Sequence, residues 1–367
     1  GEKTDALEIF HPERMASRYF NKETVRPGHV GTNLVNLNTT MLEFNSINLR
    51  TWSRLGQRGT FFGMAIFDVA QQFDNLIVAT ADLGYLSGLE RFMNTHPEKF
   101  LNIGIAEQNM LGISAGMAQE GKLVFATTYA TFITMRSCEQ LRHYLGYMKS
   151  NVKVVGTGAG LIMTWSGNTH YSIEDISIAR SIPNMVVLSP ADPAEAYKVA
   201  LAAAKYDGPV YIRLTGGLNQ PQVYKNDYNF EIGKAVQMTE DGEVTIFATG
   251  SMVYNSIKAA EMLKEKGLQA GVVNIHTIKP IDKECITNKC NSSKLLVVVE
   301  EHSKIGGLGG AIAEHLSSLS KRPPLLRMGI KDQFQHAGDY NYLLGINRLM
   351  PEQIADDILK AYQSHFS

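Results

Sequence analysis

Glu107 is the first residue of interest, because its carboxyl group could hold or transfer a proton beside a bound ligand. It lies in the run FLNIGIAEQNMLGISAG, where a strand-like stretch ends and a helical pattern rich in Gly and Ala begins. Small residues there let a ligand approach closely. An acidic residue in the first turn of a helix also interacts favourably with the helix dipole, by about 0.3–1 kcal/mol. Residue type alone therefore leaves a catalytic and a structural role open.

Two further segments supply aromatic and imidazole groups. Tyr129 and Phe132 stand three positions apart after the strand-like run LVFAT, a spacing that fits a core pair or the wall of a binding site. His170 lies between a Gly-Asn turn and a predicted helix, where an imidazole can point into a cleft. Each feature considered alone is more typical of structure than of chemistry.

Positioning these side chains requires a scaffold, and the sequence predicts one from residue 58 onward. Short apolar runs rich in β-branched residues alternate with helical patterns, which indicates parallel sheets covered by helices on both faces. After a polar stretch the alternation restarts with VTIFATG. We therefore expect an α/β protein with two doubly wound domains of mostly parallel sheets, at 56–216 and 233–367. A linker at 217–232 joins them, and an extension at 1–55 shows no sustained helical or strand period.

Composition excludes several classes of protein. The chain has 367 residues with 44% hydrophobic and 19% charged residues, which are ordinary values for a folded globular protein. Its 35 Lys and Arg residues against 36 Asp and Glu residues give a net charge of −1, so no electrostatic footprint for nucleic acid or an anionic membrane is expected. Three cysteines and a charged N-terminus favour a cytoplasmic location.

Taken together and in this order, the segments resemble the transketolase family of thiamine diphosphate enzymes. The resemblance is to the family's pyrimidine-binding domain followed by its C-terminal domain, and it covers about residues 56–367. The phrases that carry it are IGIAEQNM, the aromatic strip before EQLR, GNTHYSIEDI, ARSIPNMVVLSPADPAEA, PVYIRL, HTIKPID and EEHSKIGGLGGAIAEHL. Their combination is far more specific than any one of them.

The resemblance implies how this chain contacts thiamine diphosphate. Glu107 matches the glutamate that hydrogen-bonds the pyrimidine N1′ and promotes its imino tautomer, and it is one of two expected catalytic residues. Phe132 matches the aromatic residue that stacks on the pyrimidine, and Tyr129 matches its neighbour in the same wall. Asp82 and Leu83 match a loop beside the cofactor.

The same resemblance implies how the substrate is held. His170, the second expected catalytic residue, matches the histidine that contacts a substrate hydroxyl or oxyanion. Arg58 and Arg213 match two arginines that bind a substrate phosphate, a task suited to a bidentate guanidinium. Ser87 is a further candidate for that phosphate.

Some positions depart from the family pattern. Ser166 and Asn168 stand in the segment where many transketolases have an aspartate, and Gly158 stands where full-length enzymes place a phosphate-contacting histidine. The identity of the sugar therefore does not follow from the resemblance.

The Gly-Asp-Gly and Asn-Asn motifs with which the family holds Mg²⁺ and the diphosphate do not occur in the sequence. We therefore expect no metal ligand on this chain, with Mg²⁺ bound mainly by an N-terminal transketolase subunit that carries the pyrophosphate domain. A homodimer contact within a heterotetramer of two plus two chains is the implied assembly.

The implied activity is transfer of a two-carbon ketol unit from a ketose donor to an aldehyde acceptor. Two enzyme alternatives share the fold: the β subunit of a 2-oxoacid dehydrogenase E1 and deoxyxylulose phosphate synthase. A non-catalytic partner subunit is an alternative of another class.

Overall fold

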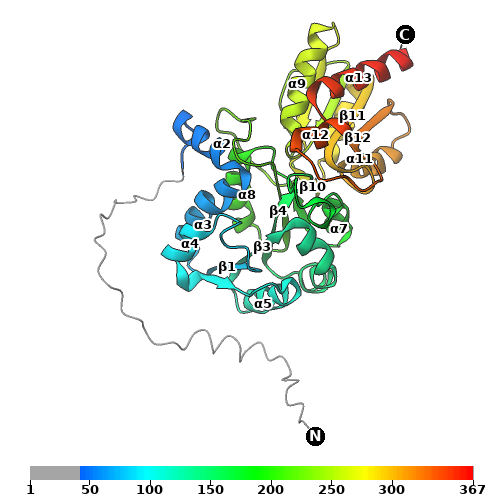
Figure 1. Cartoon of the computed structure of the whole chain (residues 1–367). Helices are drawn as coiled ribbons and strands as arrows, with labels where there is room; N and C mark the ends of the chain where they lie inside the picture. The colour runs from blue at the N-terminus through cyan, green and yellow to red at the C-terminus, as the bar shows by residue number, and fades with distance from the viewer. Residues whose placement is uncertain (1–41, 367) are drawn as a thin grey trace, which may run out of the picture. The chain divides into compact units, whose positions relative to one another are not determined.

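The computed structural model describes residues 42–366, which contain two mostly parallel sheets with flanking helices (Figure 1). The first sheet has seven strands in the order β10-β5-β6-β4-β3-β1-β2 and the second has five in the order β12-β11-β8-β9-β7. The strands of the first sheet are β1 (Leu76–Thr80), β2 (Phe100–Asn102), β3 (Leu123–Tyr129), β4 (Val152–Ala159), β5 (Val186–Leu188), β6 (Val210–Thr215) and β10 (Thr277–Lys279). Those of the second are β7 (Val236–Gln237), β8 (Val244–Ala248), β9 (Ala270–Asn274), β11 (Leu295–Ser303) and β12 (Leu325–Ile330). The predicted α/β class with mostly parallel sheets is confirmed.

Helices connect the strands along the chain. The α-helices are α2 (Ser46–Thr60), α3 (Ile66–Gln72), α4 (Glu90–Thr95), α5 (Glu107–Gln119), α6 (Cys138–Gln140), α7 (Asp175–Ser181), α8 (Pro193–Lys205), α9 (Met252–Glu265), α10 (Lys283–Ser292), α11 (Leu308–Ser317), α12 (Tyr340–Ile346) and α13 (Pro351–Phe366). Wider π-helical turns occur at η1 (Phe61–Ala65), η3 (Phe132–Arg136) and η4 (Leu141–Tyr147), and 3₁₀ turns at η2 (Pro97–Lys99) and η5 (Gly167–Thr169). None of the helices within residues 42–366 is long and apolar enough to span a bilayer.

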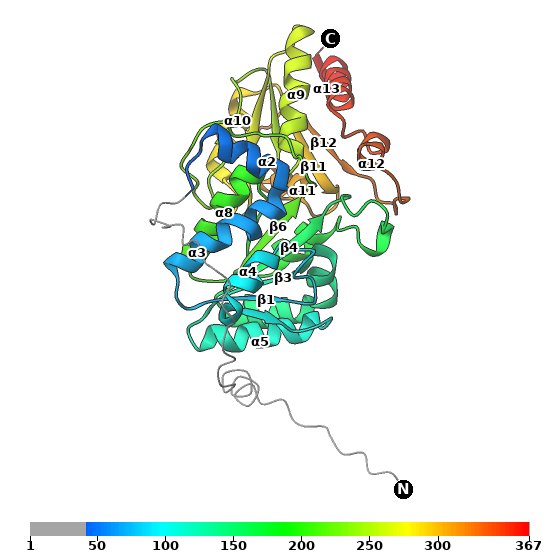
Figure 2. The same ribbon diagram turned by 60° about the vertical axis from the view of Figure 1, so that its left-hand side comes forward.

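Both faces of the first sheet are buried, as expected for a parallel sheet between helical layers (Figure 2). Successive residues of β1 point to opposite faces: Ile77 belongs to the same apolar cluster as Met110 and Leu111 of α5, whereas Val78 belongs to the cluster that contains Trp52 of α2. A run without exposed positions is the consequence: β1 is buried along its whole length, and it is apolar up to Thr80.

One edge strand of each sheet departs from the parallel pattern: β10 pairs antiparallel with β5 in the first sheet, and β7 pairs antiparallel with β9 in the second. The segment HTIKPID contributes β10, which comes from beyond β9 in the chain yet pairs antiparallel with β5 of the first sheet. Thr277 is opposite Leu188 in this pairing. The chain thus returns to the first sheet after three strands of the second, β7, β8 and β9.

Part of the expected extension is folded. Of residues 1–55, those up to 41 lie outside the described residues, whereas 46–55 form most of helix α2, contrary to the expectation that no helical period is present. Asn45 caps this helix, with its side chain accepting hydrogen bonds from the backbone N–H groups of Ile47 and Asn48. Trp52 is fully buried and stacks on Tyr197 of α8, with ring centroids 4.9 Å apart.

Candidate active site

The expected site residues follow the carboxyl ends of neighbouring strands. Asp82 follows β1, Tyr129 ends β3, and the loop after β4 carries His170. Because β4, β3 and β1 are adjacent and parallel, these residues emerge at one edge of the sheet. The carboxyl edge of an open α/β sheet is where such folds bind ligands.

Glu107 is the first residue of α5, and its side chain is buried with 6% of the residue exposed. Its Oε1 accepts a hydrogen bond from Nη1 of Arg136 at 2.9 Å, so the buried carboxylate has a cationic partner. Removing a carboxylate from water is costly unless a cation or hydrogen-bond donor compensates the lost hydration. Arg136 supplies that compensation from the end of η3.

Three rings form a wall beside this ion pair. The centroid of Phe132 lies 5.6 Å from that of Tyr129 and 5.1 Å from that of His170. Tyr129 and His170 are 5.7 Å apart, in an edge-to-face arrangement. The guanidinium carbon of Arg136 lies 3.7 Å from the centroid of Phe132. Glu107 and His170, which are 63 positions apart in the sequence, thus belong to one connected set of contacts that runs through Arg136 and Phe132.

Thr169 orients the imidazole of His170. Its hydroxyl lies 2.8 Å from Nδ1 of His170, and the histidine is half-buried. A hydrogen bond at one ring nitrogen fixes the ring and leaves the other nitrogen for a substrate.

Arg58 lies near this wall at the end of α2. Burial lowers the pKa of its guanidinium, and interaction with Tyr129 acts in the opposite direction. Burial likewise raises the pKa of Tyr129. Among residues 42–366 no carboxylate forms an ion pair with Arg58. This part of the protein therefore leaves its charge available to an anion.

A glycine sets the direction of the chain just before Arg58. Gly56 has φ of +68°, and a Cβ there would lie 2.1 Å from the carbonyl oxygen of Gly217. Only glycine tolerates both the left-handed backbone and this contact. The next residue, Gln57, is buried, with Nε2 donating to the carbonyl of Pro190 at 2.8 Å. These contacts hold the backbone that bears Arg58.

Asp82 and Leu83 form a short turn after β1. Asp82 adopts φ of +60° and exchanges two hydrogen bonds with Asn102: its N–H donates to Oδ1 at 3.1 Å, and Nδ2 of Asn102 donates to its Oδ1 at 3.0 Å. The N–H of Leu83 donates to the hydroxyl of Thr80 at 3.3 Å. Oδ1 of Asn102 also accepts a hydrogen bond from the N–H of Gly104 at 3.0 Å, so one side chain joins the turn to the segment that leads into α5.

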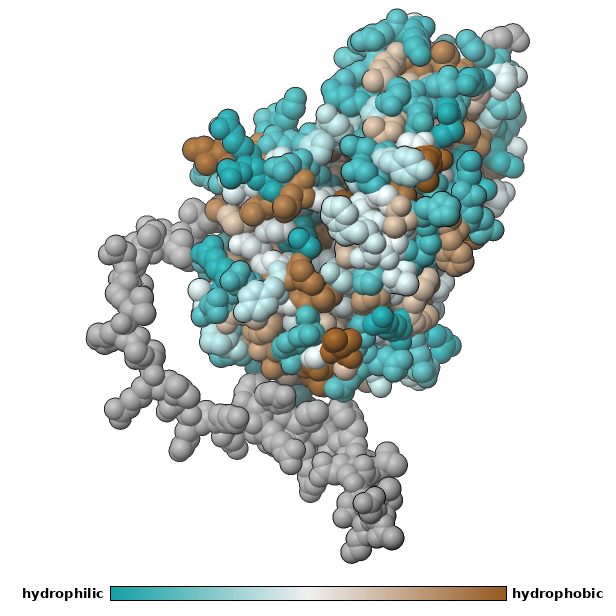
Figure 3. Space-filling model, in the orientation of Figure 1, coloured by the Kyte–Doolittle hydropathy of each residue, from teal (hydrophilic) through white to brown (hydrophobic). Residues whose placement is uncertain are grey.

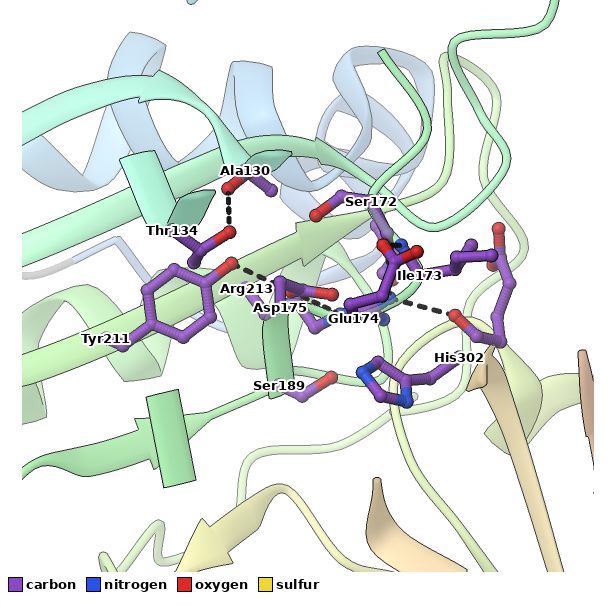
Figure 4. Close-up of polar contacts among 12 residues, drawn as sticks. Ala130, Thr134, Ser172, Ile173, Glu174, Asp175, Ser189, Tyr211, Arg213 and His302 are labelled. Carbon is purple, nitrogen blue, oxygen red and sulfur yellow. Dashed lines mark hydrogen bonds and ion pairs between the residues drawn. The ribbon is translucent and has the colours of Figure 1, made fainter. Parts of the chain in front are cut away.

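Two expected substrate residues are placed differently. Ser87 is fully buried, and within the described residues its hydroxyl has no hydrogen-bond partner. Arg213 is 1% exposed, with Nε donating to Oδ2 of Asp175 at 2.8 Å and Nη2 to the carbonyl of Glu301 at 2.8 Å. Figure 4 shows Tyr211 and Arg213 directed at the same carboxylate. Burial closes both residues to a sugar phosphate, so the geometry gives neither one that role.

Comparison with known proteins identifies the family. Residues 58–221 match the transketolase pyrimidine-binding domain, and residues 233–354 match the transketolase C-terminal domain. A putative transketolase C-terminal section from Methanocaldococcus jannaschii is 41% identical over 82% of this chain and 94% of that protein. The chain belongs to the transketolase family.

Further relatives of this transketolase-family chain are also subunits. A 6-deoxy-6-sulfo-D-fructose transketolase subunit from a Clostridium species is 39% identical over 76% of this chain and 86% of that protein. A solved split-gene transketolase, described as an inactive β4 tetramer, matches with a TM-score of 0.76 and 37% identity over 84% of this chain and 98% of that chain. The chain is thus similar to the C-terminal subunit of split transketolases, a family of thiamine diphosphate-dependent transferases.

Sequence reasoning missed Arg136 as a partner of Glu107 and missed the support of the His170 loop. The signal for Arg136 was its spacing of four residues from Phe132, which places the two side chains on one face of a helical turn. The supports of the loop come from the far end of the chain. Asn168, for example, hydrogen-bonds Gln335, and no local pattern could have indicated that pairing.

Proposed function

We propose that this chain is the pyrimidine-binding subunit of a two-component transketolase that transfers a two-carbon ketol unit from a ketose to an aldehyde. The observation that supports this most directly is the buried Glu107 carboxylate, which Arg136 links to the wall formed by the rings of Phe132, Tyr129 and His170. A buried acid next to an aromatic wall suits a flat ligand that stacks and also exchanges a proton.

The donor set fits the aminopyrimidine of thiamine diphosphate. Glu107 would hold the proton shared with the ring nitrogen, and Phe132 and Tyr129 would hold the ring and exclude water. Arg136 already shows that a flat cation fits between these groups, since it contacts both Glu107 and Phe132. When bound, thiamine diphosphate supplies the nucleophilic carbon that makes cleavage of a ketose carbon–carbon bond possible.

His170 is proposed to bind the reacting end of the sugar. With Nδ1 engaged by Thr169, its Nε2 can donate to or accept from a substrate hydroxyl. The neighbouring Tyr129 and Phe132 rings limit the space around the imidazole and so orient it. Proton exchange at this nitrogen accompanies the change of a hydroxyl into a carbonyl.

Arg58 is proposed to bind an anionic group at the far end of the substrate. A guanidinium that is partly removed from water and lacks an acidic partner within residues 42–366 gains from a phosphate or sulfonate. A relative is named for 6-deoxy-6-sulfo-D-fructose, whose sulfo group is anionic. The Arg58→Gln variant is therefore expected to raise KM for a sugar phosphate about tenfold or more, with a smaller effect on the unphosphorylated sugar.

A partner subunit is proposed to bind Mg²⁺ and the diphosphate, because the family's Gly-Asp-Gly and Asn-Asn motifs are absent from the sequence. Large apolar side chains are exposed close to the site: Tyr85 is 70% and Ile105 is 77% exposed. They lie near Asp82 and Glu107 in the chain, where a second chain would cover them. Apolar residues also interrupt the hydrophilic surface in Figure 3. We propose a heterotetramer of two plus two chains.

The test is isothermal titration of thiamine diphosphate and Mg²⁺ into the full chain, with and without a candidate N-terminal subunit, followed by an assay of ketol transfer. Glu107→Gln keeps the size of the side chain and removes its acid, so ketol transfer by the pair is expected to fall by at least about 10²-fold. Glu120→Gln, at the exposed end of the same helix, serves as the control. Full activity of Glu107→Gln would contradict the proposal.

Related measurements distinguish the alternative functions. Release of CO₂ from a 2-oxoacid would favour a 2-oxoacid dehydrogenase or a deoxyxylulose phosphate synthase over a transketolase. Absence of cofactor binding by every combination of chains would favour a non-catalytic partner. Tight binding of the diphosphate by this chain alone would contradict the two-component assembly.

A further inference from the structure

Arg136 makes two contacts at once, one with an acid and one with an aromatic face. Its Nη1 donates to Oε1 of Glu107 at 2.9 Å, and its guanidinium carbon lies 3.7 Å from the ring centroid of Phe132. At that distance a planar guanidinium is in stacking contact with the ring. The side chain of Glu107 is 7% exposed and that of Arg136 is 49% exposed. One partner is therefore fixed and buried, and the other reaches it from the surface.

These are the contacts proposed above for the aminopyrimidine ring. A guanidinium and an aminopyrimidine are both flat, both carry N–H donors at the edge, and both stack on an aromatic face. They differ in whether the carboxyl group of Glu107 must carry a proton. The guanidinium donates to an ionised carboxylate, whereas the ring nitrogen is an acceptor that needs a proton from the carboxyl group. The two partners therefore compete for Glu107 in different protonation states.

The local backbone allows the side chain of Arg136 to leave the site while its main chain stays in place. Phe132 begins and Arg136 ends the π-helical turn η3, whose wide turn brings residues four apart nearly into line. The carbonyl oxygen of Arg136 accepts a hydrogen bond from Nε2 of Gln108 at 2.8 Å. This bond holds the main chain against α5, while the half-exposed side chain retains room to turn towards solvent.

We propose that Arg136 is an internal competitor for the aminopyrimidine, so that loading of the ring requires its guanidinium to leave Glu107 and Phe132. The inference rests on the proposed function of this site. It assigns to Arg136 a role in setting affinity and selectivity: only a ligand that both stacks and bonds to the acid replaces both contacts.

The test uses the full chain and thiamine, which carries the aminopyrimidine without the diphosphate. Titration calorimetry compares wild type with Arg136→Met, Arg136→Gln and Arg136→Lys, and Arg142→Met serves as a control, because Arg142 is exposed and contacts His143 instead. The Met and Gln variants are expected to bind thiamine about three- to tenfold more tightly. The Lys variant, which keeps the charge and lacks the flat fork, is expected to gain less.

A second readout depends on competition and not on activity. Methylguanidinium at a non-denaturing concentration is expected to weaken thiamine binding to Arg136→Met more than to wild type, because it restores the missing competitor. Thermal unfolding verifies that each variant is folded. Equal or weaker binding of thiamine by both neutral variants would overturn the role of Arg136. If no variant binds thiamine, and none binds thiamine diphosphate with Mg²⁺ and the partner, the proposed function fails together with the inference.

Discussion

Asn168 and Gln335, which are 167 positions apart in the chain, exchange two hydrogen bonds. Nδ2 of Asn168 donates to the carbonyl of Gln335 at 2.6 Å, and the N–H of Gln335 donates to Oδ1 of Asn168 at 3.0 Å. Two further bonds join the same segments, from the N–H of Gly338 to the carbonyl of Thr164 and from the hydroxyl of Tyr171 to the carbonyl of His336. The loop that carries His170 is thus supported by a segment near the C-terminus.

The Asn168→Ala substitution is expected to loosen this loop, because it removes both bonds to Gln335. The expected loss of unfolding free energy is about 1–2 kcal/mol, and amide exchange should accelerate in residues 164–171. Hydrogen–deuterium exchange measures the second effect directly. Asn341→Ala, at an exposed position with no side-chain hydrogen bond within the described residues, is the control. Unchanged exchange in the loop would show that the pair does not hold it.

Arg213 and Asp175 form a buried pair whose separation should be costly. Both residues are 1% exposed, and Asp175 also accepts a hydrogen bond from Tyr211 at 2.7 Å (Figure 4). Arg213→Met leaves a buried carboxylate without its cation and is expected to lower the unfolding free energy by about 3–5 kcal/mol. Chemical denaturation checks this.

The control for that prediction is the exposed pair of Lys360 and Asp356, for which Lys360→Met is expected to cost about 0.5 kcal/mol or less. Adding Asp175→Asn to Arg213→Met should recover part of the loss, since the uncompensated charge is then gone. A small effect of Arg213→Met alone would show that the pair contributes little to the stability of the fold.

Sequence reasoning predicted well where the pattern is local. The apolar runs that became β1, β3 and β4 do not alternate with exposed positions, because both faces of a parallel sheet are buried, and the residues following them share one edge. Glu107, Phe132 and His170 could be proposed together because each stands near a strand-to-helix transition in a motif that resembles one family, and their roles stay predictions.

It failed where long-range burial decides the role of a residue. Arg213 lies in the strand motif PVYIRL. Its guanidinium, however, donates hydrogen bonds to Asp175 and to the carbonyl of Glu301, 88 positions away. The helical residues 46–55 were missed because their polar composition hides a short apolar stripe. Leu49 and Trp52 form that stripe. Its burial depends on the packing of Trp52 against Tyr197 of α8, which the local sequence does not indicate.

Gly158 should resist substitution by a residue with a side chain. Its φ is +65°, and a Cβ there would lie 3.0 Å from Cγ and Sδ of Met163 and 3.4 Å from Cδ1 of Tyr129. Gly158→Ala is expected to cost about 1–2 kcal/mol from the backbone alone and more from crowding. Gly121, with φ of +79° and open space around its Cβ position, is the matched control. Thermal unfolding should therefore show a larger loss for Gly158→Ala than for Gly121→Ala, and equal losses would refute the crowding of Tyr129 and Met163.

His302 makes the stability of the protein depend on pH. Burial lowers the pKa of its imidazole from 6.5 to about 4, and within the described residues its Nε2 has no partner. Between pH 4 and 6.5 the folded state therefore binds fewer protons than the unfolded state. The contribution of the neutral imidazole to the free energy of unfolding is present above pH 6.5 and is lost as pH falls towards 4. The full difference is about 3 kcal/mol. His302→Asn keeps a donor near Nδ1, which lies 2.8 Å from the carbonyl of Ser303, and does not titrate. Unfolding free energies measured from pH 7.5 to 4.5 should fall more steeply for wild type than for His302→Asn. The control variant His143→Asn, at an exposed position, should follow wild type. Parallel curves for all three proteins would exclude His302 as the titrating group.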